Sequence, residues 1–280
     1  MFDTIEKIGN STIQHGKSND RIYLMKLDEG DAPQIIDHLE DLAKFNEYTK
    51  FFAKIPKSQT DHFIKKGFKT EAKIPGFYNG KEDAYFLAKY YDKQRASVDI
   101  NISETIKNNI DTALKKGKDD SNRTLHDDFI IRKLEPQDAE QLSELYKIVF
   151  KTYPFPIHDP SFIIKTMKDY VVYFGVFYGD KLVAASSCET DRSSESVEMT
   201  DFATNPDYRG HSFGVILLRE MEKYMQDQDY KCTYTIARAM SPAMNITFAK
   251  LGYKFSGTLI NNTNISGKIE SMNVWYKPLN

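Results

Sequence analysis

The chain has 280 residues, of which 40% are hydrophobic and 28% are charged, and its formal net charge at pH 7 is -2. This composition predicts a soluble globular protein of one large or two modest domains, and it excludes disorder as the default state. The near-neutral charge gives no electrostatic basis for a nucleic-acid partner or an anionic membrane surface, which require a concentrated excess of Lys and Arg.

Two features of the sequence concern the location of the protein. The N-terminal stretch MFDTIEKIGN lacks the apolar region of a signal peptide, and no segment approaches the eighteen or so consecutive apolar residues of a membrane helix. Cys188 and Cys232 both stand in apolar, strand-like stretches, which favours small core residues in a reducing compartment over a disulfide. We therefore predict a cytoplasmic protein with no membrane partner.

The first part of the chain, residues 1–120, is predicted to form a separate α/β domain. RIYLMKL and TKFFAKI predict strands, and APQIIDHLEDLAKF between them predicts a helix. The apolar residues of that helix recur with a helical period at Ile35, Ile36, Leu39, Leu42 and Ala43. HFIKKG predicts a short helix ended by Gly67, and strands follow around FKTEAKI and AYFLAKYY. The polar stretch KNNIDTALKKGKDDSNRTLHDDF is typical of an exposed connector, so we place a domain boundary near residue 120.

Residues 121–280 are predicted to form a three-layer α/β/α sandwich with a mixed, mostly antiparallel sheet. DFIIRKL predicts a strand, EPQDAEQLSELYKIVFKTY a helix that ends near Tyr153, and SFIIKTMKD a second helix. A hairpin follows, with VVYFGVFY and KLVAASSCET joined at Gly179 and Asp180. SVEMTDFAT predicts the next strand, and a helix runs from about Phe213 to Gln226. The remaining segments are a strand in KCTYTIARA, a helix in AMNITFAKLG, and final strands around FSGTLI and SMNVWYKPL.

The two halves resemble each other. HFIKKGFKTEAKI aligns with TFAKLGYKFSGTL at a constant offset of 185 residues, and each copy follows an apolar strand. Where the second half has TNPDYRGHSFG before its helix, the first half has the shorter and acidic LDEGDAPQ. Carboxylates would repel a bound polyphosphate, so the first copy is predicted to be a degenerate and structural one.

The stretch TDFATNPDYRGHSFGVILLREME, residues 200–222, carries the main functional signal. A helix N-terminus presents unpaired main-chain N–H groups and the positive end of the helix dipole, and glycines let these amides approach an anion closely. Arg209 adds a cation at the mouth of this turn, while Gly210 and Gly214 remove side chains that would block the approach. This strand, turn and helix predict a pyrophosphate site, with a plain loop as the alternative.

The same stretch resembles the phosphate-binding signature of the GNAT superfamily of acetyl-CoA-dependent N-acetyltransferases. In that signature, Arg or Gln is followed after two residues by Gly and, one residue later, by Gly or Ala. Arg209, Ser212 and Gly214 stand at these positions, so Ser212 departs from the expected Gly. NITFAKLGY, which begins at Asn245, resembles the second motif of the superfamily, and the element order of residues 128–280 matches as well.

Both halves of the chain also resemble the β-lysine Nε-acetyltransferases, a family within that superfamily. The similar stretches are IQHGKSNDRIYLMKL, IPGFYNGKEDAYF, TIARAMSP and NNTNISGKIESMNVWYKPL. The resemblance implies acetyl transfer from acetyl-CoA to the terminal amine of β-lysine. The product, Nε-acetyl-β-lysine, is a net-neutral zwitterion, which suits a compatible solute made under salt or osmotic stress.

The resemblance further implies where the coenzyme binds. The implied coenzyme-binding residues are Phe202, Ala203, Thr204, Arg209, Gly210, His211, Ser212, Phe213, Gly214, Val215 and Asn245. A main-chain N–H near Phe202 or Ala203 is expected to stabilise the acetyl oxygen as it gains charge, which requires strands 197–204 and 231–237 to splay apart. No metal site is expected, because the histidines are scattered and the cysteines are not paired at ligand spacing.

The chemistry requires a base, because neutralising a lysine-type amine at pH 7 costs about 4.6 kcal/mol. Glu198 lies eleven residues before Arg209, where some GNAT relatives carry a glutamate base; an outward-facing strand residue is the alternative. Asp201 has the opposite strand parity and is expected to bind a substrate ammonium, unless a bulge changes its direction. Phe248 occupies the position of the tyrosine that usually protonates the thiolate, which leaves Tyr253, a water or unassisted departure.

Substrate recognition should involve a cation for the carboxylate of the substrate. Arg238, at the end of the YTIAR strand, is expected to bind it in a bidentate way, with a surface arginine as the alternative. Tyr153, in TYPFPIHDP, is expected in the substrate wall, because the loop between the first two helices has this role in the superfamily. An N-acetyltransferase for another amine, such as lysine, a polyamine or a protein lysine, and a non-catalytic acyl-CoA sensor stay as alternatives. The sequence also leaves open the oligomeric state, for which a homodimer is one option, and the contribution of the N-terminal half to the pocket.

Overall fold

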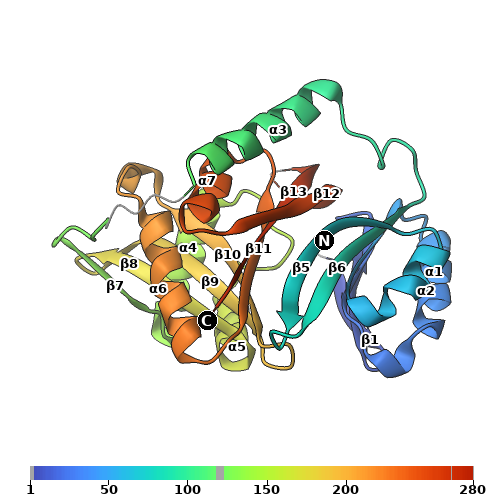
Figure 1. The fold of residues 1–280 in the computed structure, drawn as a ribbon. Helices are drawn as coiled ribbons and strands as arrows, with labels where there is room; N and C mark the ends of the chain where they lie inside the picture. Colours follow the sequence, from blue (N-terminus) through green and yellow to red (C-terminus); the bar gives the residue numbers. More distant parts are fainter. Residues whose placement is uncertain (1–2, 118–122, 266, 280) are drawn as a thin grey trace.

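The computed structural model describes residues 3–117, 123–265 and 267–279, and two β-sheets lie side by side in it (Figure 1). The N-terminal sheet has six strands in the order β1-β2-β3-β4-β6-β5. Its strands are β1 (Thr4–Ile8), β2 (Ser11–Gly16), β3 (Arg21–Lys26), β4 (Lys50–Pro56), β5 (Lys69–Tyr78) and β6 (Glu82–Tyr90). The helical elements are η1 (Glu29–Asp31), α1 (Gln34–Phe45), η2 (Lys57–Gln59), α2 (Thr60–Lys65) and, beyond the sheet, α3 (Ile100–Lys115).

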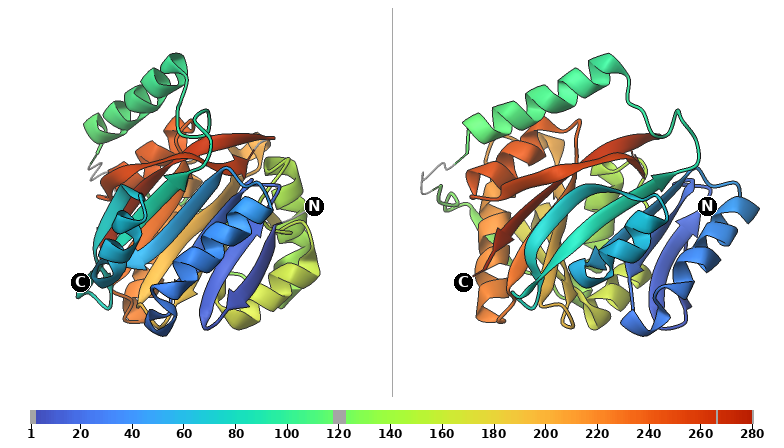
Figure 2. Two further views of the ribbon diagram at one scale, coloured as in Figure 1. Left: turned by 90° about the vertical axis from the view of Figure 1, so that its right-hand side faces the viewer. Right: turned by 45° about the vertical axis from the view of Figure 1, so that its right-hand side comes forward.

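Period-two alternation gives the N-terminal sheet two different faces. One face packs against α1 and α2, through residues such as Ile22, Phe51 and Leu39. The other face carries Tyr23, Phe52 and neighbouring side chains toward the second sheet. Figure 2 shows α1 and α2 on the side of this sheet that is turned away from the second sheet. The predicted strands and helices of this half are confirmed, whereas the hairpin of β1 and β2 was not predicted because its sequence is polar and short.

The C-terminal sheet has seven strands in the order β12-β13-β11-β10-β9-β8-β7. Its strands are β7 (Phe129–Lys133), β8 (Val171–Tyr178), β9 (Lys181–Asp191), β10 (Ser196–Thr204), β11 (Cys232–Arg238), β12 (Lys254–Ile265) and β13 (Lys268–Pro278). The helical elements are η3 (Pro136–Asp138), α4 (Ala139–Val149), α5 (Pro160–Asp169), η4 (Pro206–Tyr208), α6 (Phe213–Asp227) and α7 (Pro242–Lys250). One core cluster joins the sheet to α6 and α7 and another joins it to α4 and α5, so the predicted three-layer sandwich is confirmed.

The N-terminal half repeats the topology of the second half without β7, α4 and α5, so that β1 and β2 correspond to β8 and β9. In each half two parallel strands flank a crossover helix: β3 and β4 around α1, and β10 and β11 around α6. In each half the second of these strands is followed by a short helix, then by a hairpin whose later strand is the inner one. Gly67 and Gly252, the glycines of the sequence repeat, both take positive φ, of +87° and +81°, immediately after their helices. The structure therefore supports a half-length copy of the fold in the first half.

The two sheets meet where β5 lies beside β12. The hydroxyl of Ser256 donates to the carbonyl oxygen of Lys73 at 2.7 Å, and the N–H of Lys73 donates to that hydroxyl at 2.8 Å. A Cβ placed on Gly257 would lie 2.0 Å from the carbonyl oxygen of Glu71, so only glycine permits this backbone approach. The contact fixes the face of the N-terminal sheet over β11, β12 and β13.

Helix α3 lies across α7 of the C-terminal half (Figure 1). Ala113 belongs to the core cluster beneath α6 and α7, and the Asn109 amide donates to the carbonyl oxygen of Ala239 at 3.0 Å. Residues 107–115 are thus helical, and the prediction of a connector there is wrong because few buried apolar residues mark this helix. The domain boundary expected near residue 120 lies outside the described residues.

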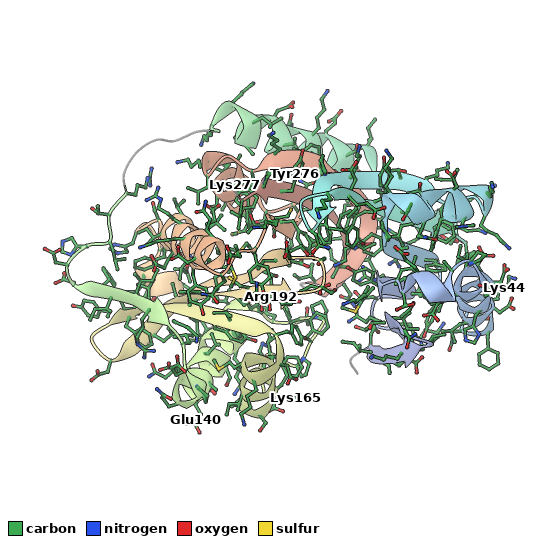
Figure 3. All side chains as sticks on the ribbon, turned by 60° about the horizontal axis from the view of Figure 1, so that its bottom comes forward. Lys44, Glu140, Lys165, Arg192, Tyr276 and Lys277 are labelled. Atoms are coloured by element: carbon green, nitrogen blue, oxygen red, sulfur yellow. The ribbon has the colours of Figure 1, made fainter. Side chains whose placement is uncertain are left out.

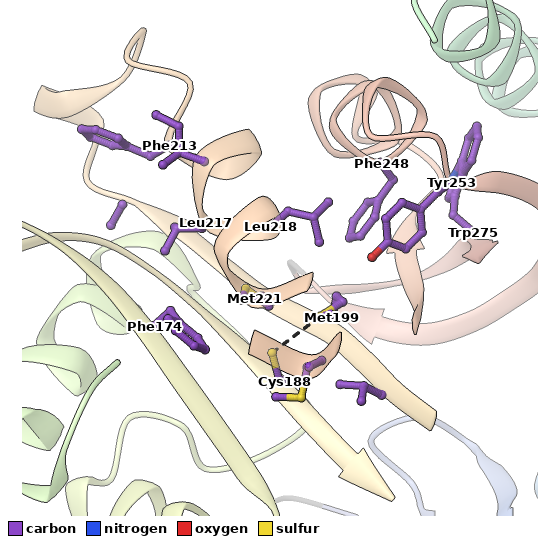
Figure 4. Close-up of a cluster of buried hydrophobic side chains, with 14 of the residues drawn as sticks. Phe174, Cys188, Met199, Phe213, Leu217, Leu218, Met221, Phe248, Tyr253 and Trp275 are labelled. Atoms are coloured by element: carbon purple, nitrogen blue, oxygen red, sulfur yellow. Dashed lines mark hydrogen bonds between the residues drawn. The ribbon is translucent and has the colours of Figure 1, made fainter. Parts of the chain in front are cut away.

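The core beneath α6 contains Phe248, Tyr253, Met199 and Cys188, as Figure 4 shows. Cys188 and Cys232 are buried and free, which confirms the prediction that they are not a disulfide. Charged side chains such as Lys44, Glu140 and Lys165 point outward from their helices (Figure 3). In the part of the chain that the structure describes, no helix has the length and apolar character needed to span a bilayer.

Candidate active site

The predicted phosphate turn connects β10 to α6 through η4. Gly210 has φ +93°, and Ser212, the N-cap of α6, has φ 61° and ψ 27° in the left-handed region. Within the described ranges, no acceptor is found for the main-chain N–H groups of residues 210–214. A Cβ on Gly210 would meet no atom within 4 Å, and one on Gly214 would only touch Thr247 at 3.8 Å. The turn therefore presents a row of open donors at a helix N-terminus, which fits a diphosphate.

Side chains around the turn hold its shape. The ring of His211 stacks on Phe213 at 5.3 Å with an interplanar angle of 14°, so this residue offers its amide to the turn. The Arg123 guanidinium donates to the Ser212 hydroxyl. Arg123 was not predicted as part of this region, because its segment carries no motif.

The left-handed conformation of Ser212 leads to a prediction. Ser212→Ile should destabilise the protein by about 1–2 kcal/mol and raise the KM for acetyl-CoA about tenfold, because a β-branched residue is strained at positive φ. Ser212→Gly is the matched control and should preserve that KM. Thermal unfolding and steady-state kinetics measure both effects; equal KM values in the two variants would show that the geometry of the turn is not required.

Strands β10 and β11 separate beside this turn. Their parallel pairing covers only Ser196, Val197 and Glu198, opposite residues 232–234. Beyond Glu198, β10 has no ladder with β11, so the predicted splay is confirmed. A cavity of about 340 Å³ opens here and extends between the two sheets. Phe202 and Phe248 line it on the side of α7, at the place where a thioester arm would enter.

Glu189, Glu198 and Asp201 are among the carboxyl side chains that line the cavity, together with Asp191. Glu198 and Glu189 are direct partners in the antiparallel pair of β10 and β9, so they share a face. Asp201 has φ 54° within a bulge between Thr200 and Ala203, and this bulge turns its side chain toward the same cavity. The bulge named as the exception in the prediction is therefore present, and Glu198 and Asp201 face the same cavity in spite of their opposite strand parity. Glu189 was missed because nothing in the sequence distinguishes it from other residues of its strand.

The environments of these carboxyl groups differ. Burial raises the pKa of Glu198, and the Lys54 charge and a hydrogen bond from Tyr234 oppose that shift in part. Burial, followed by the neighbouring charges of Glu198 and Asp201, raises the pKa of Glu189 well above its usual range. Like charges confined together favour a shared proton over full ionisation. Burial and neighbouring charges therefore favour the protonated form of Glu189, and burial raises the pKa of Glu198 above its ordinary range.

Asp201 is held by three hydroxyl donors. Tyr153 donates to its Oδ1 atom, Ser187 donates to its Oδ2 atom at 2.7 Å, and Thr200 donates to Oδ1 at 3.5 Å. Burial raises the pKa of Asp201, and these hydrogen bonds lower it in part. Tyr153 thus lines the cavity and anchors the aspartate. Among residues 3–117, 123–265 and 267–279, no group of three or more His, Cys, Asp or Glu side chains is arranged to hold a metal ion.

Comparisons with known proteins agree with this geometry. The profile of the Acetyltransferase (GNAT) family matches residues 142–253. The chain is 42% identical to the β-lysine N(6)-acetyltransferase of Methanococcus maripaludis over 99% of each chain. It is 33% identical to the N-acetyltransferase YodP of Bacillus subtilis over the whole of both chains. It is 29% identical to the β-lysine N(6)-acetyltransferase of Methanosarcina mazei, over 89% of this chain and 98% of that one.

The chain belongs to the β-lysine N(6)-acetyltransferase family of GNAT enzymes. It is therefore an N-acetyltransferase that uses acetyl-CoA, and the fold class predicted from the sequence is confirmed. Among the described residues, the main-chain amides of residues 210–214 are open, as a bound diphosphate would require, and the cavity beyond them offers room for an amine.

Two predicted site residues of this acetyltransferase have side chains engaged inside the protein. The Asn245 amide donates to the carbonyl oxygens of Arg238 and Ser241 at 3.0 and 2.7 Å, and its oxygen accepts from Asn273 and Trp275 at 2.8 Å each. Arg238 lines the cavity, but its guanidinium makes a bidentate ion pair with Glu270 at 2.9 Å for both contacts. The structure thus gives Arg238 an internal carboxylate partner.

Phe248 and Tyr253 also have definite places in the acetyltransferase. Phe248 lines the cavity, and its ring packs edge-on against Phe202 and Tyr253 at 5.5 and 5.0 Å. Tyr253 is buried beneath it, in the core under α6 (Figure 4). Tyr253, one of the alternatives for thiolate protonation, is not among the residues that line the cavity.

The N-terminal half supplies the opposite wall of the cavity. The contributing side chains come from β2, β3 and β4, and they are Thr12, Gln14, Arg21, Tyr23, Met25, Lys26, Phe52 and Lys54. The Lys54 ammonium donates to the Tyr234 hydroxyl at 3.1 Å, which joins this wall to β11. Burial lowers the pKa of Lys54, and the charge of Glu198 opposes that shift. The expected structural copy is therefore also part of the site wall.

Proposed function

We propose that this acetyltransferase moves the acetyl group of acetyl-CoA to the ε-amine of β-lysine and forms Nε-acetyl-β-lysine. The observation that carries the proposal is the 42% identity, over 99% of both chains, with a protein named for this reaction. The cavity supports it, because acidic and basic side chains both line it, as a substrate with two amines and one carboxylate requires.

We propose Glu198 as the base. Its carboxyl lies at the last paired residue before β10 and β11 separate, which is where the amine would meet the thioester. Its raised pKa brings it closer to neutrality, which suits a group that must take a proton at physiological pH. The ammonium then transfers its proton to Glu198, directly or through water, and the neutral nitrogen can attack the acetyl carbon.

The chain also supplies groups for the other parts of the reaction. Acetyl-CoA supplies an activated acetyl group as a thioester. Main-chain N–H groups near Phe202 and Ala203, beyond the last β10–β11 pair, are our candidates to donate to the acetyl oxygen as it gains charge. Arg209, residues 210–215 and Thr204 are proposed to hold the coenzyme. Asp201 is proposed to bind an ammonium of the substrate, with Tyr153 fixing its orientation.

A substrate panel tests the proposed reaction. The purified enzyme is incubated with acetyl-CoA and β-lysine, L-lysine, spermidine or a lysine peptide, and release of free CoA is recorded. Fragmentation mass spectrometry of the product locates the acetyl group. Turnover with β-lysine at the ε-nitrogen supports the proposal, whereas similar turnover with every amine favours a general N-acetyltransferase. Saturable acetyl-CoA binding without turnover would favour a sensor.

We further propose that the product serves as a compatible solute. Acetylation removes one positive charge and leaves a carboxylate, one ammonium and an amide, so the molecule accumulates without disturbing charge balance. Deletion of the gene should abolish the Nε-acetyl-β-lysine signal in cell extracts and slow growth at high salt. Normal growth of the deletion strain in high salt would remove this physiological role while leaving the reaction intact.

A further inference from the structure

The part of the cavity between β2, β3 and β12 contains three buried polar side chains with unused hydrogen-bonding atoms. Gln14, Arg21 and Asn262 are only 2%, 4% and 1% exposed, and all three line the cavity. Among the described residues, no partner is found for Gln14 Nε2, Arg21 Nε or Asn262 Oδ1. Buried polar atoms are normally paired, so this combination of two donors and one acceptor calls for an explanation.

Arg21 is the central member of this cluster. Its guanidinium donates to the main-chain oxygen of Asn262, to Thr263 Oγ1 at 3.3 Å and to Gln14 Oε1 at 3.5 Å, all of which are neutral acceptors. In the described part of the chain no carboxylate lies within ion-pair distance of it. Arg95 and Arg238, by contrast, face Asp20 and Glu270. A desolvated cation without an anion is costly, which suggests that a ligand supplies the anion.

We propose that Arg21 and Gln14 bind the carboxylate of the amine substrate, and that Asn262 Oδ1 accepts a hydrogen bond from its β-ammonium. This inference rests on the proposed β-lysine reaction and names the recognition site for the end of the molecule that does not react. Arg21 Nε and Gln14 Nε2 can each donate to one carboxylate oxygen. Arg21 is preferred as the carboxylate ligand over Arg238, because the guanidinium of Arg238 already forms a bidentate pair with Glu270.

The distribution of charge in the cavity fits a substrate that spans it. The Arg21 guanidinium lies 5.3 Å from the centroid of the Tyr23 ring, and Arg21, Tyr23 and Glu198 all line the cavity. The ε-amine would lie at Glu198 while the carboxylate lies at Arg21. A diamine without a carboxylate would leave Arg21 buried and unpaired, and the site would reject it for that reason.

The test compares β-lysine with 1,4-diaminopentane, which keeps both amines and lacks the carboxylate. In Arg21→Gln, kcat/KM for β-lysine should fall about a hundredfold, whereas kcat/KM for 1,4-diaminopentane should change by less than about threefold. Arg95→Gln is the matched control, because Arg95 is also buried in the N-terminal half and donates to a β12 carbonyl, but does not line the cavity. It should leave the ratio of the two kcat/KM values unchanged.

Gln14→Glu provides a second variant in case Arg21→Gln does not fold. It places a carboxylate beside Arg21, which should raise the melting temperature and still cause a selective loss with β-lysine. The inference is supported if the ratio of kcat/KM for β-lysine to kcat/KM for 1,4-diaminopentane falls in the Arg21 and Gln14 variants but not in Arg95→Gln. If the unmodified enzyme acetylates β-lysine and the ratio survives these changes, the inference alone is overturned. If the unmodified enzyme does not acetylate β-lysine, the proposed function fails, and the inference with it.

Discussion

Glu198→Gln is expected to lower kcat at pH 7 by about 10²–10⁴-fold while leaving the affinity for CoA unchanged. The amide keeps the size and hydrogen-bonding reach of the carboxylate but cannot accept the proton of the ammonium. The coenzyme turn at residues 209–215 does not depend on this side chain, so binding and chemistry should separate. Stopped assays of CoA release and calorimetric titration with CoA measure the two quantities.

The pH profile gives this prediction a second readout. Burial raises the pKa of Glu198, and the base is protonated as the pH falls through that pKa. The acid limb of kcat/KM should therefore lie above the ordinary range of glutamate, and Glu198→Gln should lack it. Glu195→Gln, in the turn before β10 and outside the cavity lining, is the control and should behave as the unmodified enzyme. A parallel loss of CoA affinity, or an intact acid limb in Glu198→Gln, would refute the assignment of Glu198 as the base.

Glu71→Gln is expected to lower the free energy of unfolding by about 3–5 kcal/mol, because it leaves a buried lysine without its anion. Lys50 is fully buried, and its ammonium lies 3.0 Å from Glu71 and 2.8 Å from the carbonyl oxygen of Ile260. Glu71 also accepts hydrogen bonds from the Tyr90 hydroxyl and, at 2.9 Å, from the Ile260 amide. This network joins the N-terminal sheet to β12, so its loss should loosen the contact between the halves. Urea unfolding measures the change.

Two further variants separate the charge effect from a loss of packing. Lys50→Met combined with Glu71→Gln removes both charges and keeps an oxygen acceptor, so it should be more stable than Glu71→Gln alone. Asp41→Asn disrupts the exposed pair with Lys44 and should cost about 0.5 kcal/mol or less. Equal free energies of unfolding for Glu71→Gln and Asp41→Asn would show that the pair of Lys50 and Glu71 is not desolvated.

The pH dependence of stability follows from the direction of the Lys50 shift. Burial lowers the pKa of Lys50, and the charge of Glu71 opposes this. A lysine whose pKa is lower in the folded state binds fewer protons there than in the unfolded chain, so stability rises with pH through that interval. Glu71→Gln removes the opposing charge. The loss of unfolding free energy relative to the unmodified protein should therefore be smaller at pH 9.5 than at pH 7.

The fold of the second half and the strand, turn and helix at the proposed coenzyme site could be predicted because their signals are local. Arg209, Gly210 and Gly214 stand together in sequence, and the strand before them and the helix after them have clear periodicities. The spacing of eleven residues between Glu198 and Arg209 also predicted that Glu198 lies near the turn. The direction of Asp201 could not be predicted, because the bulge that turns it depends on pairing with β9.

The opposite wall of the cavity could not be predicted for a different reason. Gln14 and Arg21 become functional candidates only when β12, about 240 residues later, closes over them, as the contact of Arg21 with Asn262 shows. Similarly, the sequence gives no indication that Lys50, a charged residue at the start of a strand, is fully buried. Long-range closure of this kind leaves no signature in a short stretch of sequence.

The repeated topology has a consequence for how this enzyme could change over evolution. One copy contains the turn that we propose for the coenzyme, together with Glu198 and Asp201, while the other has a shorter, acidic segment in place of that turn and contributes Gln14, Arg21 and Tyr23 to the shared cavity. Substitutions in the N-terminal copy can therefore change which amine is accepted without affecting the binding of the acetyl donor. Homologues that act on another amine should carry their first amino-acid differences in β2, β3 and β4. The repeated segment would then be the part of the enzyme in which substrate specificity changes.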